Sequence, residues 1–442
     1  MSDTPLEYDA LVIGAGAGGL FTAARLVQAG YRTLVTERLD RVGGRASTHD
    51  IDGFKVNNGA IVIEIGGITE QTFTELGIPF PVREPKPPIL YRIKNKDVDV
   101  TGGGWGMLIG QLTRQGAKLV SGLGAARNDS GLPEDEISTA DWVRKFTKNE
   151  AVHGIFHNMC GSIFAVGSED LPARVFLTYF TRKSAFKRFG FCPDGTIGVW
   201  QALADYITGN GSDVWLNTEV TGLQVTENRV TSATVRRDGT DTRVNVRVAV
   251  SDAGPSATVG LLGADTLPAD YVAEVARKDR PCAMIAVTFA SRTPLIKASG
   301  MLSFATTQRL CYIANFTDLC PEMAPEGWHL YVGTAVPKPA IGDFDEAAET
   351  ELLMADLREQ VPGFEQARIL STTITRDGWP PQRAVAGFDL PHDTPLDNLW
   401  NVGDAVKEYA NGGTTACAET AQLVVEKIRA AVPVATGAGD PA

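Results

Sequence analysis

The sequence has few of the residues that build metal sites and disulfide frameworks. Its 442 residues include five histidines and six cysteines, scattered along the chain, and no two cysteines form a CxxC pair. This spacing supports neither a zinc site nor a disulfide framework. We therefore expect buried or incidental thiols and no bound metal.

Long apolar runs and basic clusters are also absent. No uncharged apolar run approaches the roughly 20 residues that are needed to span a bilayer. The acidic, polar start of the chain, residues 1–9, shows no signal-peptide pattern. A net charge of −12 disfavours a nucleic-acid surface and attraction of the whole surface to anionic lipid. The sequence therefore predicts a cytoplasmic protein with no nucleic-acid partner.

The most informative segment lies within the first 45 residues. An apolar run, residues 11–13, leads into the glycine-rich GAGAGG at residues 14–19, and a helix-like stretch then continues to Gly30. A second apolar run, residues 33–36, ends at the acid Glu37. This order of strand, glycine turn, helix, strand and acid is typical of a site for the ADP half of a dinucleotide.

The residues of this motif have separate physical roles. Gly14 allows the tight turn out of the strand, Gly16 lets the pyrophosphate approach the backbone, and Gly19 lets the helix pack close to the sheet. The start of the helix offers unpaired N–H groups and a partial positive charge to the phosphates. Glu37 follows Gly14 by 23 residues, which suits the acid that binds the ribose hydroxyls, and it disfavours a 2′-phosphate.

A second glycine turn, residues 41–45, points to FAD rather than NAD.

The chain is long enough for two domains or for one large discontinuous domain. We expect helices over residues 197–207, 345–360 and 415–431. We expect strands over residues 214–216, 219–225, 230–237, 243–251, 284–290, 310–316 and 330–335. We predict a discontinuous FAD-binding domain (residues 1–80, 189–277 and 392–432), a substrate-binding domain (81–188 and 278–391) and a disordered tail (433–442).

The FAD-binding segments, taken in order, resemble the flavoprotein superfamily of phytoene desaturases, carotenoid isomerases, amine oxidases and protoporphyrinogen oxidase. Residues 14–37, 41–45, 193–225 and 399–428 carry the resemblance, which is loose elsewhere. It implies an α/β fold, in which a Rossmann-like FAD-binding domain of the GR2 type has an inserted α+β substrate domain. It also implies non-covalent FAD, because no cysteine or histidine matches an attachment motif.

The resemblance also assigns residues to the cofactor. Val220 stands where the superfamily lays a backbone edge against adenine, and Asp404 stands where an acid hydrogen-bonds the ribityl-diphosphate. The N–H groups at the start of the last helix, near Thr415, are expected to face the flavin C2 carbonyl. The implied FAD-binding residues are Gly14, Gly16, Gly19, Glu37, Arg38, Gly43, Gly44, Arg45, Gly59, Val220, Gly403, Asp404, Gly413, Thr414 and Thr415.

Two absences separate the chain from typical amine oxidases. Those enzymes usually carry a lysine in the substrate-domain strand near flavin N5, and the matching run, residues 284–291, has none. They often place an aromatic residue just before the last helix, where this chain has Gly412-Gly413. We therefore expect FAD-dependent dehydrogenation of a C–C bond in a small apolar isoprenoid or alicyclic ketone. Amine oxidation and a non-catalytic prenyl-binding module of the same fold are the alternatives.

The substrate end of the site is less clearly marked. Tyr409 is a candidate acid/base or a packed loop tyrosine, and Trp379 and Tyr312 are candidate pocket walls or core residues. We expect the charges of Lys407 and Glu408 to be solvated in their loop.

The partners follow from the expected chemistry. Reoxidation of the flavin would need O2 or a quinone-type carrier as the electron acceptor. The sequence is compatible with a homodimer, and with peripheral membrane contact through an apolar patch in residues 81–188.

Overall fold

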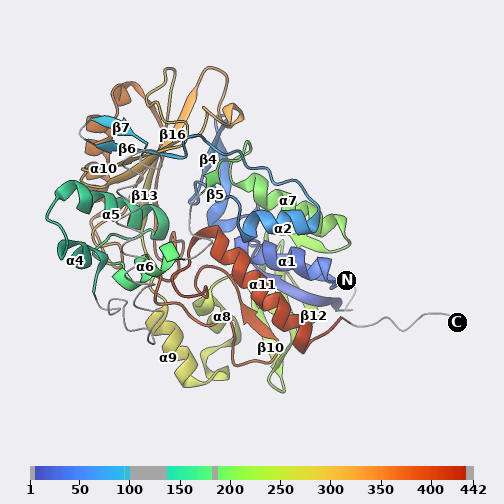
Figure 1. Ribbon diagram of the computed structural model, residues 1–442. Helices are drawn as coiled ribbons and strands as arrows, with labels where there is room; N and C mark the ends of the chain where they lie inside the picture. Colours follow the sequence, from blue (N-terminus) through green and yellow to red (C-terminus); the bar gives the residue numbers. More distant parts are fainter. Residues whose placement is uncertain (1–4, 94, 100–136, 182–187, 435–442) are drawn as a thin grey trace.

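The computed structural model describes residues 5–93, 95–99, 137–181 and 188–434. Two seven-stranded sheets organise this part of the chain, and helices pack against both of them (Figure 1). No helix in the described ranges is both long and apolar enough to cross a membrane.

The first sheet draws its strands from three distant parts of the chain. The strands are β1 (Leu6–Ile13), β2 (Thr33–Thr36), β9 (Asp213–Trp215), β10 (Thr218–Thr226), β11 (Arg229–Arg237), β12 (Thr240–Ser251) and β18 (Leu399–Asn401). Their order is β10-β11-β12-β1-β2-β9, with β18 paired to β12. The strands β2, β9, β12 and β18 join the sheet through parallel pairs, whereas β10, β11 and β12 form an antiparallel meander.

The parallel register decides where the functional residues meet. Ile13 at the end of β1 lies beside Thr36 of β2 and Ser251 of β12, and Ser251 lies beside Asn401 of β18. Because the carboxyl ends of parallel strands share one edge of a sheet, the residues that follow them are brought together there. The glycine turn after β1 and the acid Glu37 after β2 therefore meet the segments that follow β12 and β18.

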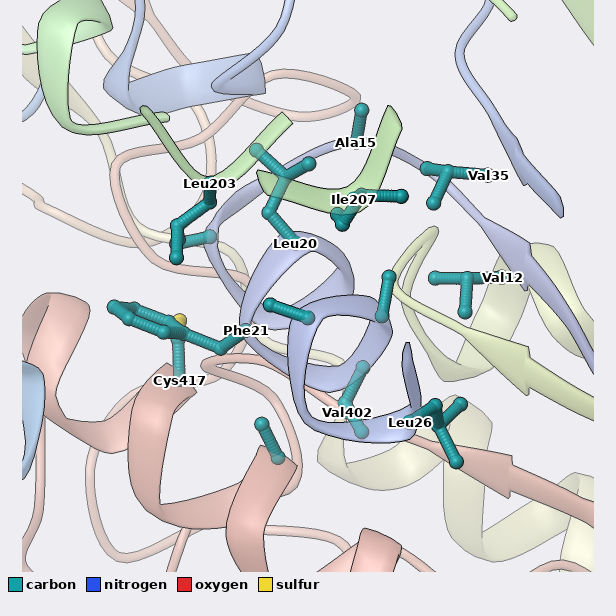
Figure 2. Close-up of a cluster of buried hydrophobic side chains, with 14 of the residues drawn as sticks. Val12, Ala15, Leu20, Phe21, Leu26, Val35, Leu203, Ile207, Val402 and Cys417 are labelled. Atoms are coloured by element: carbon teal, nitrogen blue, oxygen red, sulfur yellow. The ribbon is translucent and has the colours of Figure 1, made fainter. Parts of the chain in front are cut away.

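Three helices bury one face of this sheet. They are α1 (Ala17–Gln28), α7 (Ile197–Gly209) and α11 (Gly413–Ala431), and α1 contacts the other two. Figure 2 shows Leu20 and Phe21 of α1 between Leu203 of α7, Cys417 of α11 and the sheet. Full burial of a side chain such as Phe21 contributes about 1.5–3 kcal/mol. This packing fixes the start of α1 and the start of α11 on the same sheet.

The second sheet is mixed and mainly antiparallel. Its strands are β6 (Ile89–Ile93), β7 (Lys96–Val98), β13 (Met284–Ser291), β14 (Met301–Phe304), β15 (Leu310–Asn315), β16 (His329–Ala335) and β17 (Arg368–Thr375), and their order is β17-β13-β16-β15-β14-β6-β7. Helix α10 (Glu346–Gln360) covers one face, and α5 (Glu150–Phe164) with α6 (Ala173–Thr181) covers the other. Successive residues of β15 accordingly join different cores, Tyr312 on the α5 side and Ile313 on the α10 side.

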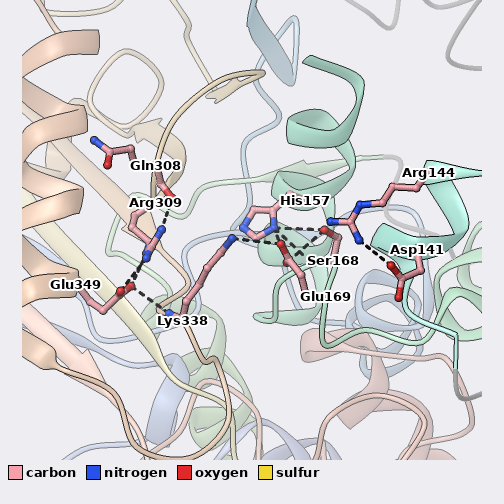
Figure 3. A network of polar contacts seen from close by, with 9 residues as sticks. All are labelled: Asp141, Arg144, His157, Ser168, Glu169, Gln308, Arg309, Lys338 and Glu349. Atoms are coloured by element: carbon pink, nitrogen blue, oxygen red, sulfur yellow. Dashed lines mark hydrogen bonds and ion pairs between the residues drawn. The ribbon is translucent and has the colours of Figure 1, made fainter. Parts of the chain in front are cut away.

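A polar network joins the helices of the second sheet to its strands (Figure 3). Glu169 accepts from His157 of α5 at 3.1 Å and pairs with Lys338, just after β16, at 3.2 Å. The backbone N–H of Lys338 donates to Glu349 of α10 at 3.0 Å, and Glu349 also pairs with Arg309. These contacts connect both helical layers through the end of one strand.

The remaining elements are short. They are the hairpin β3 (Thr48–Ile51) and β4 (Phe54–Asn57), the pair β5 (Ile63–Glu64) and β8 (Phe189–Gly190), and the helices α2 (Ile68–Leu76), α4 (Thr139–Arg144), α8 (Pro255–Leu262) and α9 (Ala269–Lys278). Ser138 caps α4 by accepting from the backbone N–H of Asp141 at 3.0 Å. Strand β5 carries Glu64 into the site described below.

The α/β fold class is confirmed, and the predicted helices and strands are present with small shifts at their ends. The strands β6, β7, β14 and β17 were not predicted. β6 and β7 lie at one edge of the second sheet, and β17 lies at the other. The sequence of β17 is largely polar, so it lacks the clear alternation of apolar and polar residues that marks a strand. The strands of the first sheet fall within the segments predicted for the FAD-binding domain, and those of the second sheet fall within the segments predicted for the substrate-binding domain. The domain boundaries themselves stay predictions. The predicted tail lies outside the described residues from position 435 onward.

Candidate active site

A cavity of about 610 Å³ is lined by residues from both sheets. Its volume lies in the usual range for a small-molecule or cofactor site. Twelve of the fifteen predicted FAD-binding residues line it, and Gly19, Gly403 and Thr415 stand just behind its wall. We call the part beside the glycine turns the nucleotide end, and the part beside β13, β15 and α5 the inner end.

The first glycine turn has the predicted geometry. Gly14 has a φ of 99°, which favours glycine, and its N–H donates to Thr36 O at 2.8 Å. A Cβ at Gly19 would lie 2.0 Å from Gly14 O, so only glycine allows this close packing. A Cβ at Gly16 would lie 2.4 Å from Asp252 Oδ2. The space at Gly16 therefore also accommodates a carboxyl group that the sequence analysis had not singled out.

Glu37 is positioned by backbone hydrogen bonds. Its carboxylate accepts from the N–H of Ala15 and the N–H of Leu39, both at 2.9 Å, and the side chain is buried at the cavity wall. A carboxylate has about four acceptor positions, so two are left for ribose hydroxyls. The geometry fits the predicted role of Glu37.

The second glycine turn is joined directly to the first. The N–H of Gly43 donates to Ala15 O at 2.8 Å, and Gly43 has a φ of 94°. A Cβ at Gly43 would lie 2.4 Å from the ring of Trp200, whose indole N–H donates to Ala46 O at 2.6 Å. The two turns thus form one backbone cradle, held from behind by α7.

Arg45, which is half-buried, and Asp404, which is buried, form an ion pair across this cradle. The guanidinium of Arg45 donates to both carboxylate oxygens of Asp404, at 2.5 and 3.0 Å, and the N–H of Arg383 donates to the same carboxylate at 2.8 Å. Burial would raise the pKa of Asp404, but the charge and hydrogen bonds of Arg45 hold that pKa well below its usual range. Asp404 is therefore an anion whose position is fixed, and its contact with the ribityl chain stays a prediction.

Asp252 is a site residue that sequence reasoning missed. It follows β12 directly, lines the cavity, and approaches the positions of Gly16, Gly18 and Gly403. Burial raises the pKa of Asp252 to about 7, although a backbone hydrogen bond from Gly19 and the charge of Arg45 lower it. The signal was present in the sequence, since Asp252 ends a strand that the pattern had already identified.

The nucleotide end also contains a cation, Arg383, that lines the cavity. Its Nε is buried without a hydrogen-bond partner in the described part of the chain, and burial lowers its pKa. Such a group needs an anion, and the diphosphate of FAD would supply one beside the start of α1. The backbone cradle, Glu37 and Arg383 together fit FAD. No local pattern marks Arg383, which lies in the loop after β17.

The three residues predicted for the substrate end lie in different places. Tyr312 of β15 and Trp379 both line the cavity, but Trp379 lies 5.9 Å from the guanidinium of Arg38, beside the nucleotide end. Tyr409 is not among the lining residues and lies 4.0 Å from a Cβ built at Gly387. The structure thus gives no support to an acid/base role for Tyr409, which stays a prediction.

The expectation that Lys407 is solvated was wrong. Its side chain is fully buried, with Nζ 2.7 Å from Asp389 Oδ1 and hydrogen bonds to the carbonyls of Ala384 and Asp404. The loop after β18 folds beneath the segment around residues 384–389, so the charge had to be paired. Glu408, the next residue, is exposed as expected.

Glu64 is the second acid that the sequence analysis missed. It stands at the end of β5, lines the cavity, and accepts a hydrogen bond from the hydroxyl of Thr414 in the first turn of α11. Burial raises the pKa of Glu64, and hydrogen bonds from Thr414 and Thr415 offset only part of that effect. The helix start that was expected to face the flavin thus also holds a carboxyl group.

Comparison with known proteins agrees with this cradle. Residues 17–429 match the family described as flavin containing amine oxidoreductase. The chain belongs to this family. It is therefore an FAD-dependent oxidoreductase, and its recognition as a member of the desaturase and amine oxidase superfamily is confirmed. Membership in an enzyme family leaves the alternative of a non-catalytic prenyl-binding module without support.

Three relatives illustrate the range of the family. The neurosporene-forming phytoene desaturase of Rhodobacter capsulatus is 26% identical over 278 residues, which is 55% of this chain and 52% of that protein. The crystal structure of an oxidoreductase from Methanosarcina mazei has a TM-score of 0.82 at 25% identity, covering 95% of this chain and all of that one. Cyclohexylamine oxidase from Brevibacterium oxydans has a TM-score of 0.64 at 16% identity, covering 96% and 99% of the two chains, and shows the shared fold alone.

Proposed function

We propose that this oxidoreductase dehydrogenates a C–C bond of an apolar isoprenoid or alicyclic ketone. The observation that supports this most is the wall of the inner end, which consists mainly of apolar and aromatic side chains. They include Ile61, Val62, Ile163, Met284 and Tyr312. Apolar walls of this kind orient a hydrocarbon ring or chain by shape.

Two features of the same wall support dehydrogenation over amine oxidation. Among the described residues that line the cavity there is no lysine, and Gly413 stands where amine oxidases often have an aromatic residue. FAD, when bound, accepts a hydride from the substrate. The chain's own residues bind the substrate, exclude water and hold its reacting carbon in place. O2 or a quinone-type carrier is the proposed electron acceptor.

Amine oxidation is the second candidate, and one observation favours it. The Glu64 carboxyl lies in the inner end, with no charged partner among the described residues. A buried carboxylate is stabilised by an ammonium group, so an amine could be held there. The fold shared with cyclohexylamine oxidase is compatible with this alternative.

The test is an anaerobic titration of the purified FAD-loaded protein, followed by flavin absorbance. One panel contains cyclohexanone and other cyclic ketones together with isoprenoids, and the other contains cyclohexylamine and putrescine. Bleaching by the first panel alone is expected. Bleaching by amines alone would replace the proposed reaction with amine oxidation.

A further inference from the structure

Among the described residues that line the inner end of the cavity, Glu64 carries the carboxyl group. It stands at the end of β5 and is held by the hydroxyl of Thr414. No described cation forms an ion pair with it. Cys417 lies one turn further along α11, and burial keeps the pKa of that thiol well above its usual value. Glu64 therefore lines the cavity without a counter-ion among the described residues.

The backbone beside Glu64 leaves room for this carboxyl. Gly413 has a φ of 67°, and a Cβ built there would lie 2.6 Å from Glu64 Oε1. Any side chain at position 413 would thus compete with Glu64 for the same space.

The other ionisable groups of the cavity are less suited to accept a proton. Glu37 and Asp404 are held by backbone amides and by Arg45, and Asp252 lies among the glycine turns of the nucleotide end. The two phenols of the inner end, Tyr179 and Tyr312, are buried, and burial raises the pKa of Tyr312 far above neutrality. Burial raises the pKa of the Glu64 carboxyl above its usual value, and a carboxyl with a raised pKa is a better general base than an ordinary one.

We propose that the Glu64 carboxylate is the general base of this site and removes the proton from the carbon next to the carbonyl group of a ketone substrate. The inference rests on the proposed dehydrogenation. Two C–H bonds break and one C=C π bond forms. The proton goes to a carboxylate oxygen of Glu64, and the neighbouring hydride leaves with its electron pair to FAD, the oxidant. Thr414 is a positioning residue, because its hydroxyl orients the carboxylate.

The test compares Glu64→Gln with the wild-type holoenzyme by anaerobic rapid mixing with cyclohexanone. Glutamine keeps the size and the acceptor oxygen that faces Thr414, but it cannot take a proton. We expect FAD retention and ketone binding to be unchanged and flavin reduction to slow by about 10²- to 10⁴-fold. The matched control is Glu70→Gln, which makes the same change on α2, outside the cavity, and should reduce as fast as wild type.

A second readout isolates the proton step. In D2O, the dithionite-reduced holoenzyme cannot accept a hydride, so exchange of the protons beside the carbonyl of cyclohexanone reports proton transfer alone. Wild type should accelerate this exchange, and Glu64→Gln should not. Glu64→Asp retains a carboxylate and should keep measurable exchange. If the glutamine variant loses FAD, exchange in Glu64→Asp still tests whether a carboxylate is the base.

The pH profile separates a base from a purely structural acid. With a base, kcat/KM rises with pH through the pKa of Glu64. Thr414→Val removes one donor to the carboxylate and should move this rise to higher pH, whereas a merely structural role would leave it unmoved. If ketones reduce the flavin of wild type and of Glu64→Gln at equal rates, the role of Glu64 is overturned and the proposed dehydrogenation is not. Failure of every ketone and isoprenoid to bleach the wild type overturns the proposed function as well.

Discussion

The two ends of the cavity are built in different ways. At the nucleotide end, backbone turns and charged side chains meet because parallel strands of one sheet end together, as the register of Ile13, Thr36 and Ser251 shows. At the inner end, the wall combines a short strand, three helices and the strands of a second sheet, and the side chains are largely apolar. The arrangement at the nucleotide end defines the class of cofactor. At the inner end, the shape of the cavity and a few polar groups select the substrate.

The difference shows how much each end depends on its charges. The nucleotide end gathers Glu37, Arg45, Asp252, Arg383 and Asp404 around the backbone cradle, so its stability and its affinity should both respond strongly to charge changes. The inner end has Glu64 as its carboxyl group, and changes there should affect turnover more than folding.

Asp404→Ala should have the largest effect on the folded protein. It leaves the half-buried guanidinium of Arg45 and the N–H of Arg383 without their acceptor, and loss of one partner from a fully buried pair costs about 3–5 kcal/mol, which is the upper limit here. The free energy of unfolding in urea should fall by up to that amount. Asp241→Ala is the control, because its pair with Arg236 is exposed to solvent and its loss should lower the stability far less. Equal losses in the two variants would contradict the ion pair between Arg45 and Asp404.

Glu37→Ala should weaken FAD binding while the protein stays folded. The change removes the acceptor proposed for the ribose hydroxyls, and hydrogen bonds to a charged group contribute about 1.5–3 kcal/mol. The FAD dissociation constant, measured by fluorescence titration of the apoprotein, should rise about 10- to 100-fold. Glu37→Gln keeps one acceptor oxygen, so its FAD dissociation constant should lie between those of wild type and Glu37→Ala. Retention of full affinity in Glu37→Ala would remove this residue from the site.

Asp252 predicts a pH dependence of cofactor affinity. Its pKa of about 7 means that it is largely neutral below pH 7 and ionised above it, and an anion there repels the diphosphate. FAD affinity of the wild type should therefore decrease as pH rises through about 7, by at most about tenfold per pH unit. Asp252→Asn should remove this dependence. A wild-type affinity that is constant from pH 5.5 to 8.5 would show that Asp252 does not face the cofactor.

Tyr409→Phe should have the smallest effect. The residue does not line the cavity, so loss of its hydroxyl should change the rate of substrate-dependent flavin reduction by less than tenfold. Acid/base residues usually contribute about 10²- to 10⁴-fold. A loss of that size, measured by anaerobic rapid mixing, would restore the catalytic role predicted from the sequence.

Sequence motifs identified the nucleotide end because its geometry is local. A positive φ at Gly14, close packing at Gly19 and an acid at the end of the next strand each leave a mark at a fixed spacing. Asp252 escaped notice although it directly follows a predicted strand, since only the sheet order shows that this strand lies beside β1. The same order brings Asp404 to Arg45, a contact across more than 350 residues.

The cofactor class and most of the backbone cradle could be predicted from the sequence alone, because they depend on turns and periodicities within about 45 residues, and local patterns also marked the strands of the first sheet. The order of those strands, which come from three distant parts of the chain, and the polar groups that line the inner end depend on the tertiary structure. Glu64 and Thr414 are 350 positions apart, and Lys407 is buried because a distant loop covers it. Long-range packing sets such contacts, and no local pattern records them.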